Sequence, residues 1–224
     1  MNLTRHNFPA TQYVRERTEK RQIVLHHTAS GPGVEGDIAW WTRTPERVAT
    51  HFIIDREGQV HQLFDEEFWA YHLGLKQEVF TRLGLPYRQL DRQSIGIEID
   101  SWGYLEPHTD GQFYPARWNG SRSVPNTAAK PVKYFYEYCT NQKWKGHRYY
   151  EKYTTAQINA VRGLVRELCR RHNIPTAYNP DMWELSRRAL SGMPGVFAHC
   201  SYRTDKSDIH PQPEMLTMLK NLQY

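Results

Sequence analysis

Apolar and polar positions follow two different periods along the chain, and these periods indicate strands and helices in turn. Residues 21–28, RQIVLHHT, form a short apolar run that ends in two histidines, which is typical of a buried strand. Residues 51–64 contain two alternating arms around a Glu-Gly turn and predict a β-hairpin. Residues 94–100, SIGIEID, place three isoleucines on one face of a strand and Gly96 and Glu98 on the other.

Helical spacing appears on both sides of these strands. Residues 154–175 repeat apolar residues at the helical period, and Thr154 with Gln157 forms a capping box at the start. Residues 36–50 predict an earlier helix, broken near a proline, and residues 194–201 predict a further short strand before a last short helix. Strands separated by helices predict an α/β fold with a mixed central β-sheet flanked by helices.

The segment 102–153 differs in composition from the rest of the chain. It is rich in Gly, Pro, Asn, Tyr and Trp and shows only weak periodicity. Long runs without structure are uncommon inside a compact domain, so short strands are expected within it. The 224 residues suit one domain, and we expect a single domain over 1–224 with an aromatic-rich insertion at 102–153.

Charge content indicates which binding partners are favoured, and cysteine spacing indicates which structural cross-links are absent. There are 29 Lys and Arg residues against 24 Asp and Glu residues, a net charge of +5 that favours approach to an acidic polymer or surface. Ordinary surface charge explains this excess equally well, since the basic residues form no tract. The sequence shows no recognition helix or aromatic-basic motif, so no nucleic-acid partner is expected. Three cysteines without CxxC spacing argue against a disulfide framework and a zinc ribbon.

The N-terminal residues contain no apolar core of a secretory signal, and no window of 18 apolar residues predicts a membrane span. We therefore expect synthesis as a cytoplasmic chain. A target in the cell wall would require a separate route of release.

Two of the eleven histidines lie where catalytic sites are commonly built. His26 and His199 each close a predicted strand, and the ends of sheet strands carry the sites of many α/β proteins. Asp208 follows nine residues after His199. Two histidines and a carboxylate, with a fourth position left for water, form a common catalytic zinc set. The alternative is that both histidines are hydrogen-bonded core residues and that Asp208 caps the next turn.

Two charged residues stand near this set. Glu98 lies inside an apolar strand, where an acid needs either a partner or a function such as general base. Lys206 shares a side of an extended segment with Asp208 and could stabilise an oxyanion. The alternatives are a cross-sheet ion pair for Glu98 and a solvated surface position for Lys206.

Five motifs occur in a characteristic order over residues 23–213: IVLHHTAS, VATHFIIDREGQV, AYHLG, SIGIEID and AHCSYRTDKSD. In this combination the chain resembles the zinc-dependent N-acetylmuramoyl-L-alanine amidases of type 2. That family includes phage lysozyme-like amidases, the anhydro-muropeptide amidase of wall recycling and peptidoglycan recognition proteins. The resemblance implies Zn²⁺ held by His26, His199 and Asp208, with Glu98 as general base and Lys206 as oxyanion stabiliser.

The resemblance also implies substrate contacts. His72 matches a family histidine near the substrate, and His27 is expected to contact the substrate or the surroundings of the metal. Trp102 and Tyr104 follow the Glu98 strand and could form an apolar platform for sugar rings, although core packing explains them equally well.

Two features depart from the family pattern. Thr50 occupies a place where phage members often carry tyrosine, which assigns the general base to Glu98. The family's DPG after the lysine is replaced by SDIHP, which leaves Asp205 as a second candidate for the carboxylate ligand.

The implied reaction is hydrolysis of the amide between N-acetylmuramic acid and L-alanine in peptidoglycan, most simply by an endolysin released through a holin or a similar route. Two alternatives stay open: a recycling amidase for soluble anhydro-muropeptides and a non-catalytic peptidoglycan-binding module.

Overall fold

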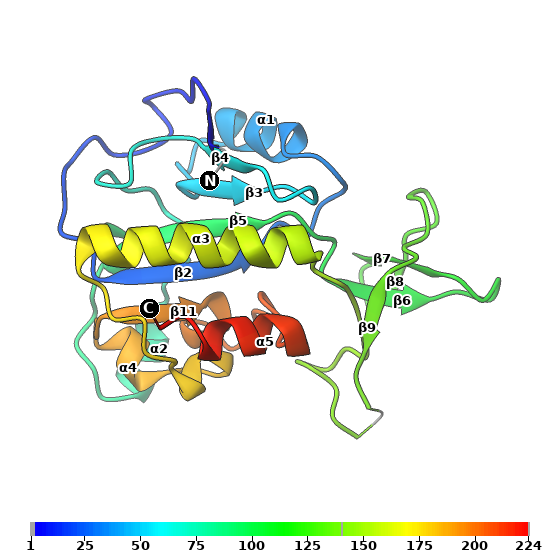
Figure 1. Cartoon of the computed structure of the whole chain (residues 1–224). Helices are drawn as coiled ribbons and strands as arrows, with labels where there is room; N and C mark the ends of the chain where they lie inside the picture. The colour runs from blue at the N-terminus through cyan, green and yellow to red at the C-terminus, as the bar shows by residue number, and fades with distance from the viewer. Residues whose placement is uncertain (1–2, 140, 224) are drawn as a thin grey trace.

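The two apolar segments that end in HH and in EID become neighbouring strands at the centre of a six-stranded sheet (Figure 1). The computed structural model describes residues 3–139 and 141–223. The strand order is β1-β4-β3-β5-β2-β11. The strands are β1 Leu3–Arg5, β2 Gln22–His27, β3 Phe52–Ile54, β4 Val60–Gln62, β5 Ser94–Ile99 and β11 Gly195–Ala198. Strands β11, β2, β5 and β3 run parallel, and β4 pairs antiparallel with β3, so the mixed sheet is confirmed.

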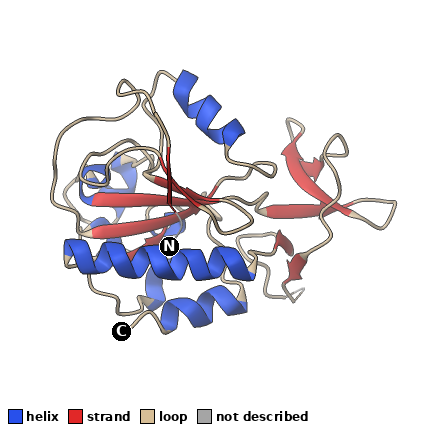
Figure 2. Ribbon diagram, turned by 45° about the horizontal axis from the view of Figure 1, so that its top comes forward, coloured by secondary structure: helices blue, strands red, loops and turns tan. Residues whose placement is uncertain are grey.

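Helices cover both faces of this sheet, as Figure 2 shows. The α-helices are α1 Glu35–Arg43, α2 Gln77–Arg82, α3 Thr155–His172, α4 Arg187–Leu190 and α5 Pro213–Lys220. Short 3-10 helices among the described residues are η1 Leu90–Gln93, η2 Pro180–Trp183 and η3 His199–Ser201. Helices α3 and α5 lie side by side against one face, and α1 lies on the opposite side (Figures 1 and 2).

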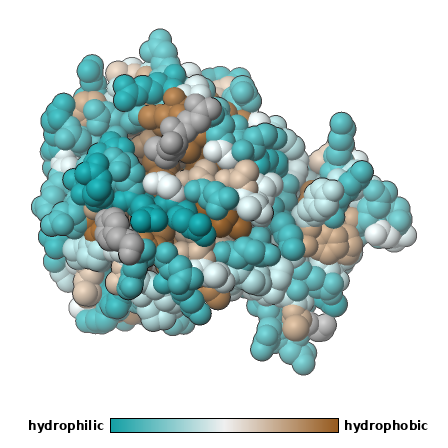
Figure 3. Space-filling model, viewed as in Figure 1, coloured by the Kyte–Doolittle hydropathy of each residue, from teal (hydrophilic) through white to brown (hydrophobic). Residues whose placement is uncertain are grey.

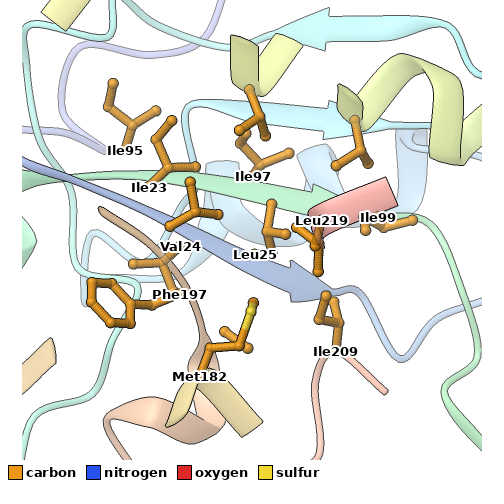
Figure 4. Packing of buried hydrophobic residues seen from close by; sticks show 14 of the residues in the cluster. Ile23, Val24, Leu25, Ile95, Ile97, Ile99, Met182, Phe197, Ile209 and Leu219 are labelled. Carbon is orange, nitrogen blue, oxygen red and sulfur yellow. The ribbon is translucent and has the colours of Figure 1, made fainter. Parts of the chain in front are cut away.

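Helix α3 forms where the apolar period and the capping box predict it. The Thr154 side chain accepts from the Gln157 amide, and the Gln157 side chain accepts from the Thr154 amide. Asn173 ends the helix in the left-handed conformation, which asparagine tolerates better than most residues. The apolar stripe of α3 packs in one cluster with the isoleucines of β5, and Figure 4 shows Ile95, Ile97 and Ile99 within this core.

Two boundaries differ from the prediction. Helix α1 ends at Arg43 rather than continuing toward residue 50, because the residue before Pro45 is pushed out of the helical region into an extended conformation. Strand β11 ends at Ala198, and His199 begins η3 instead of closing the strand.

The aromatic-rich segment forms a second sheet that projects to one side of the first (Figure 1). Its antiparallel order is β8-β7-β6-β10-β9. The strands are β6 Tyr104–Pro107, β7 Phe113–Trp118, β8 Ser123–Pro125, β9 Phe135–Glu137 and β10 Tyr149–Glu151. The ring of Phe113 lies 4.2 Å from that of Phe135 and 4.5 Å from that of Tyr149 between centroids. The short strands are confirmed, while the division into one domain with an insertion at 102–153 stays a prediction.

Ion pairs attach the second sheet to the first. The Arg56 guanidinium, just after β3, pairs with Asp100 after β5 and with Glu151 at the end of β10, the latter at 2.8 Å. Figure 3 shows the second sheet as a lobe beside the main body, with hydrophilic residues covering much of both. None of the described helices has the length and apolar composition needed to cross a membrane.

Candidate active site

Three neighbouring parallel strands bring the predicted site residues to one edge of the sheet. His26 of β2 lies in register with Glu98 of β5, and Ala198 of β11 lies in register with Leu25. His199 directly follows β11. Because parallel strands end at the same edge, these side chains come from adjacent chain segments and face one cavity.

His26, His199 and Asp208 form a buried triangle. The Nδ1 atoms of the two histidines lie 3.0 Å apart. The Oδ2 atom of Asp208 is 3.0 Å from Nδ1 of His199 and 3.3 Å from Nδ1 of His26. A tetrahedral zinc ion with bonds of about 2.0–2.1 Å holds its ligand atoms about 3.3 Å apart, so the spacing of these three atoms fits that ion.

The hydrogen bonds of the outer ring nitrogens leave the inner nitrogens free to bind a metal. The Ser94 hydroxyl donates to the Leu90 carbonyl oxygen at 3.0 Å and therefore accepts from Nε2 of His72 at 2.8 Å. The Nδ1 atom of His72 is then an acceptor, and Nε2 of His26 donates to it at 2.9 Å. This order leaves a lone pair on Nδ1 of His26, directed toward Asp208.

His199 is oriented in the same way by the backbone. Its Nε2 atom donates to the Leu73 carbonyl oxygen at 3.0 Å, so in the neutral ring the lone pair is on Nδ1. Both histidines therefore present Nδ1 to the same point.

Burial and contacts within the triangle shift the pKa values of His26 and Asp208. Burial and the neighbouring His199 lower the pKa of His26 to about 4, so the ring is neutral near pH 7, as metal binding requires. Burial alone would raise the pKa of Asp208, but His199 and His26 hold that pKa well below its usual value. Imidazole nitrogens and a carboxylate oxygen are ligands that Zn²⁺ accepts, so these three residues form a donor set suited to that ion.

Glu98 faces the same cavity without a partner. Its Oε2 atom is buried and accepts no hydrogen bond in the described structure. Burial raises the pKa of Glu98 well above its usual value, the charges of Asp208 and Asp37 raise it further, and Lys206 opposes them. The described residues include no lysine or arginine in an ion pair with Glu98, so the cross-sheet ion pair considered from sequence does not form.

The cavity at this edge has a volume of about 360 Å³. All nine site residues predicted from the sequence line it: His26, His27, His72, Glu98, Trp102, Tyr104, His199, Lys206 and Asp208. The structure thus brings them together, while the role of each residue in binding or catalysis stays a prediction.

The four residues predicted to touch substrate have different surroundings. His27 accepts at Nδ1 from the Tyr153 hydroxyl at 3.0 Å, and His72 uses both ring nitrogens in hydrogen bonds to protein. Trp102 is half-buried, and Tyr104 stacks on His147 with ring centroids 3.6 Å apart. The aromatic rings of Trp102 and Tyr104 therefore form part of the cavity wall on the side of the second sheet.

Asp205, the second candidate for the carboxylate ligand, lies outside the triangle. Its side chain is 54% exposed and pairs with Arg203 at 2.6 Å. The described groups that could hold a metal ion include Asp208 and not Asp205.

Sequence reasoning did not find the residues that position this site. Ser94, Gly96 and Glu98 share one face of β5, so the alternation along this strand already indicated that Ser94 faces the same side as Glu98. A Cβ atom on Gly96 would lie 3.0 Å from Nδ1 of His72 and 2.8 Å from the Thr50 methyl group, so this position requires glycine. Tyr153 carried no comparable signal, because its contact with His27 joins residues 126 positions apart.

The second sheet also reaches the site through a tryptophan. The Nε1 atom of Trp144 donates to the Ser207 carbonyl oxygen at 2.9 Å. Ser207 lies between Lys206 and Asp208, so this hydrogen bond fixes the backbone that carries both side chains.

Comparison with known proteins agrees with this geometry. Residues 16–213 match the family described as N-acetylmuramoyl-L-alanine amidase. The structure of PlyL is similar with a TM-score of 0.55 and 15% identity over 100% of both chains. The PlyG catalytic domain has a TM-score of 0.53 and 17% identity over 99% of this chain and 93% of that one. The structure of a mutant endolysin from Bacillus subtilis has a TM-score of 0.52 and 17% identity over 98% of this chain and 97% of that one.

At such identities the solved structures show the shared fold. No curated protein matches the chain significantly. The family match, in contrast, spans most of the sequence and includes every residue of the buried triangle together with Glu98 and Lys206. The chain therefore belongs to the family of N-acetylmuramoyl-L-alanine amidases.

Proposed function

We propose that this protein is a zinc-dependent amidase that cuts the bond between N-acetylmuramic acid and L-alanine in intact cell-wall peptidoglycan, as an endolysin does. The observation that carries the proposal is the buried triangle of His26, His199 and Asp208 beside an unpaired Glu98. The family match supports the reaction, and the similarity to a structure named as an endolysin supports the lytic role.

Nδ1 of His26, Nδ1 of His199 and Oδ2 of Asp208 would hold the zinc ion. A zinc ion bound there supplies a Lewis acid and lowers the pKa of bound water. The single carboxylate makes the site less positive than three histidines would.

Glu98 supplies the proton transfers. Its Oε2 atom accepts no hydrogen bond from protein, so it is free to take a proton from the attacking water. The same carboxyl group then gives that proton to the departing alanine nitrogen. Burial, which raises the pKa of this group, favours the protonated state that the second step needs.

Lys206 lines the cavity next to Asp208 and presents an ammonium group. We assign to it the stabilisation of negative charge on the carbonyl oxygen of the lactyl group as water attacks. Trp102 and Tyr104 provide flat apolar rings against which a sugar ring can pack, and His27 and His72 form the wall beside them.

A direct test combines zymography on purified sacculi, with and without a chelator, and mass analysis of the products. Muramoyl ends and peptides beginning with free L-alanine are expected only without the chelator. A protein that binds sacculi and releases nothing in the presence of zinc would instead be a peptidoglycan-binding module.

A recycling amidase is the remaining alternative within the same family. Turnover on intact sacculi and on soluble anhydro-muropeptide separates the two roles, and we expect faster cleavage of sacculi. Acting on the wall requires export, which we assign to a holin or a comparable route.

A further inference from the structure

A second cavity lies beside the first, between the two sheets. Its volume is about 710 Å³, and its wall includes the segment 129–134 that precedes β9. Trp102 lines both cavities, so the two are neighbours. Apart from Trp102, the proposed reaction uses none of the residues that line this second cavity.

The charge of the second cavity is strongly one-sided. Lys130, Lys133 and Lys152 line it, all three are exposed, and none forms an ion pair with a described residue. Glu151 is the one acidic residue among the described residues of the lining, and it pairs at 2.8 Å with Arg56, which also pairs with Asp100. The cavity therefore presents three exposed ammonium groups against one carboxylate that is already engaged with Arg56, and this excess of positive charge favours an anionic ligand.

Apolar surface accompanies these lysines. Tyr134 is 79% exposed although its side chain is large and mostly apolar, and Trp102 also lines the cavity. Exposed aromatic surface in a concave site is typical of ligand binding. The ligand is therefore expected to combine carboxylates with carbon chains.

Backbone hydrogen bonds hold the cavity in shape. The Val132 amide donates to the Phe113 carbonyl oxygen at 2.8 Å, and the Lys152 amide donates to the Tyr134 carbonyl oxygen at 3.1 Å. The Trp102 amide donates to Oε2 of Glu151 at 2.6 Å. The lysine-bearing segment is thus fixed to the second sheet, so binding costs little ordering of the chain.

We propose that this second cavity binds the acidic stem peptide of the peptidoglycan, beyond the alanine whose bond is cut. This assignment rests on the proposed function, because it places the bond to be cut in the first cavity. The stem peptide carries free carboxylates, whereas the N-acetylated sugars of the glycan carry no charge once the lactyl group is in amide linkage. Charge complementarity therefore selects the peptide over the glycan as the occupant.

The test compares two substrates and two variants of the zinc-loaded full chain. The substrates are N-acetylmuramoyl-L-alanyl-γ-D-glutamyl-L-lysine and the same molecule with its carboxylates converted to amides. The variants are Lys130→Gln with Lys133→Gln and, as a matched control, Arg117→Gln with Arg122→Gln. The control removes two exposed cations of the second sheet that do not line the cavity.

We expect the lysine variant to raise KM for the carboxylate substrate roughly three- to tenfold at unchanged kcat, since each exposed ion pair contributes modestly. The amidated substrate and the arginine variant should show no such change. Equal effects on both substrates, or no effect on either, would overturn the proposal.

Calorimetric binding of the free peptide L-alanyl-γ-D-glutamyl-L-lysine separates this proposal from the function itself. Binding that weakens in the lysine variant and in Tyr134→Ala supports the peptide site even if neither substrate is cleaved. Peptide binding that neither variant weakens overturns it even if both substrates are cleaved. Inhibition of substrate cleavage by uncharged N-acetylglucosamine oligomers, but not by the free peptide, would assign the cavity to the glycan. This result would overturn the proposal as well.

Discussion

The Nε2 atom of His26 donates a hydrogen bond to Nδ1 of His72 across 2.9 Å, and this bond determines which nitrogen of His26 faces Asp208. His72 is in turn held by the Ser94 hydroxyl. A histidine expected from sequence to contact substrate thus has both ring nitrogens engaged in orienting a candidate metal ligand.

This arrangement predicts the outcome of His72→Phe. The phenyl ring keeps the packing but removes the acceptor, so zinc affinity should fall about 10- to 100-fold. Competition with a chromogenic chelator measures it, and His108→Phe, on a turn of the second sheet, is the control. Unchanged zinc affinity with a raised KM would show that His72 acts on substrate instead.

The two acids of the segment 205–208 should behave differently. Asp208→Asn removes the charge that faces both histidines and should lower the bound zinc by at least about tenfold. Asp205→Asn changes an exposed residue paired with Arg203 and should leave the zinc content unchanged. Elemental analysis after dialysis compares them, and equal loss in both variants would contradict the assignment of Asp208.

Glu98→Gln isolates the proton-transfer step. The amide keeps the size of the side chain but cannot act as a base, so kcat should fall about 10²- to 10⁴-fold. Zinc content should stay at the wild-type level, because Glu98 is not part of the buried triangle of His26, His199 and Asp208. Product release from sacculi by mass analysis measures the loss, and a near wild-type rate would remove Glu98 from the mechanism.

Trp144 tests whether the second sheet supports catalysis. Trp144→Phe removes the hydrogen bond to the Ser207 carbonyl oxygen but keeps an aromatic ring against Trp183. We expect a several-fold loss in kcat, with the protein still folded, because the backbone of Lys206 and Asp208 loses one fixed point. Trp118→Phe, at an exposed position of the same sheet, should have no effect. Equal rates in both variants would restrict Trp144 to a packing role.

The buried Lys20 side chain should make the free energy of unfolding depend on pH. Burial lowers the pKa of Lys20 from 10.5 to about 7, and the ammonium group donates to the carbonyl oxygens of Phe68 and Arg92. The unfolded chain therefore binds this proton more tightly than the folded chain. Between pH 7 and 10 the free energy of unfolding should rise with pH through this residue, by at most about 1.4 kcal/mol per unit.

Urea denaturation of the wild type and of Lys20→Met at several pH values measures this effect. The wild type should gain stability relative to the variant as the pH rises. The same pH slope in both proteins would show that Lys20 titrates normally in the fold.

The sequence predicted the elements whose signals are local. The buried strands β2 and β5, the hairpin β3–β4 and helix α3 follow from apolar period and capping, which depend on neighbours a few residues apart. The order of motifs also predicted which side chains meet at the first cavity.

The remaining features depend on contacts between distant residues. The hydrogen bond from Trp144 to Ser207 spans 63 positions, and that between His26 and His72 spans 46. Weak periodicity in 102–153 indicated short strands but could not give their order, because aromatic packing across strands selects the pairing. The second cavity forms only once that sheet stands beside β5.

The register of β2 against β5 has a consequence for variation in this protein. His26 and Glu98 are opposite each other in hydrogen-bonded parallel strands, so the backbone ladder keeps the candidate metal ligand and the candidate base at a constant separation. Insertions and substitutions in the surrounding loops can reshape what the cavity admits while that separation is preserved. A shift of one residue in the ladder, however, would turn His26 to the other side of the sheet and abolish both functions at once.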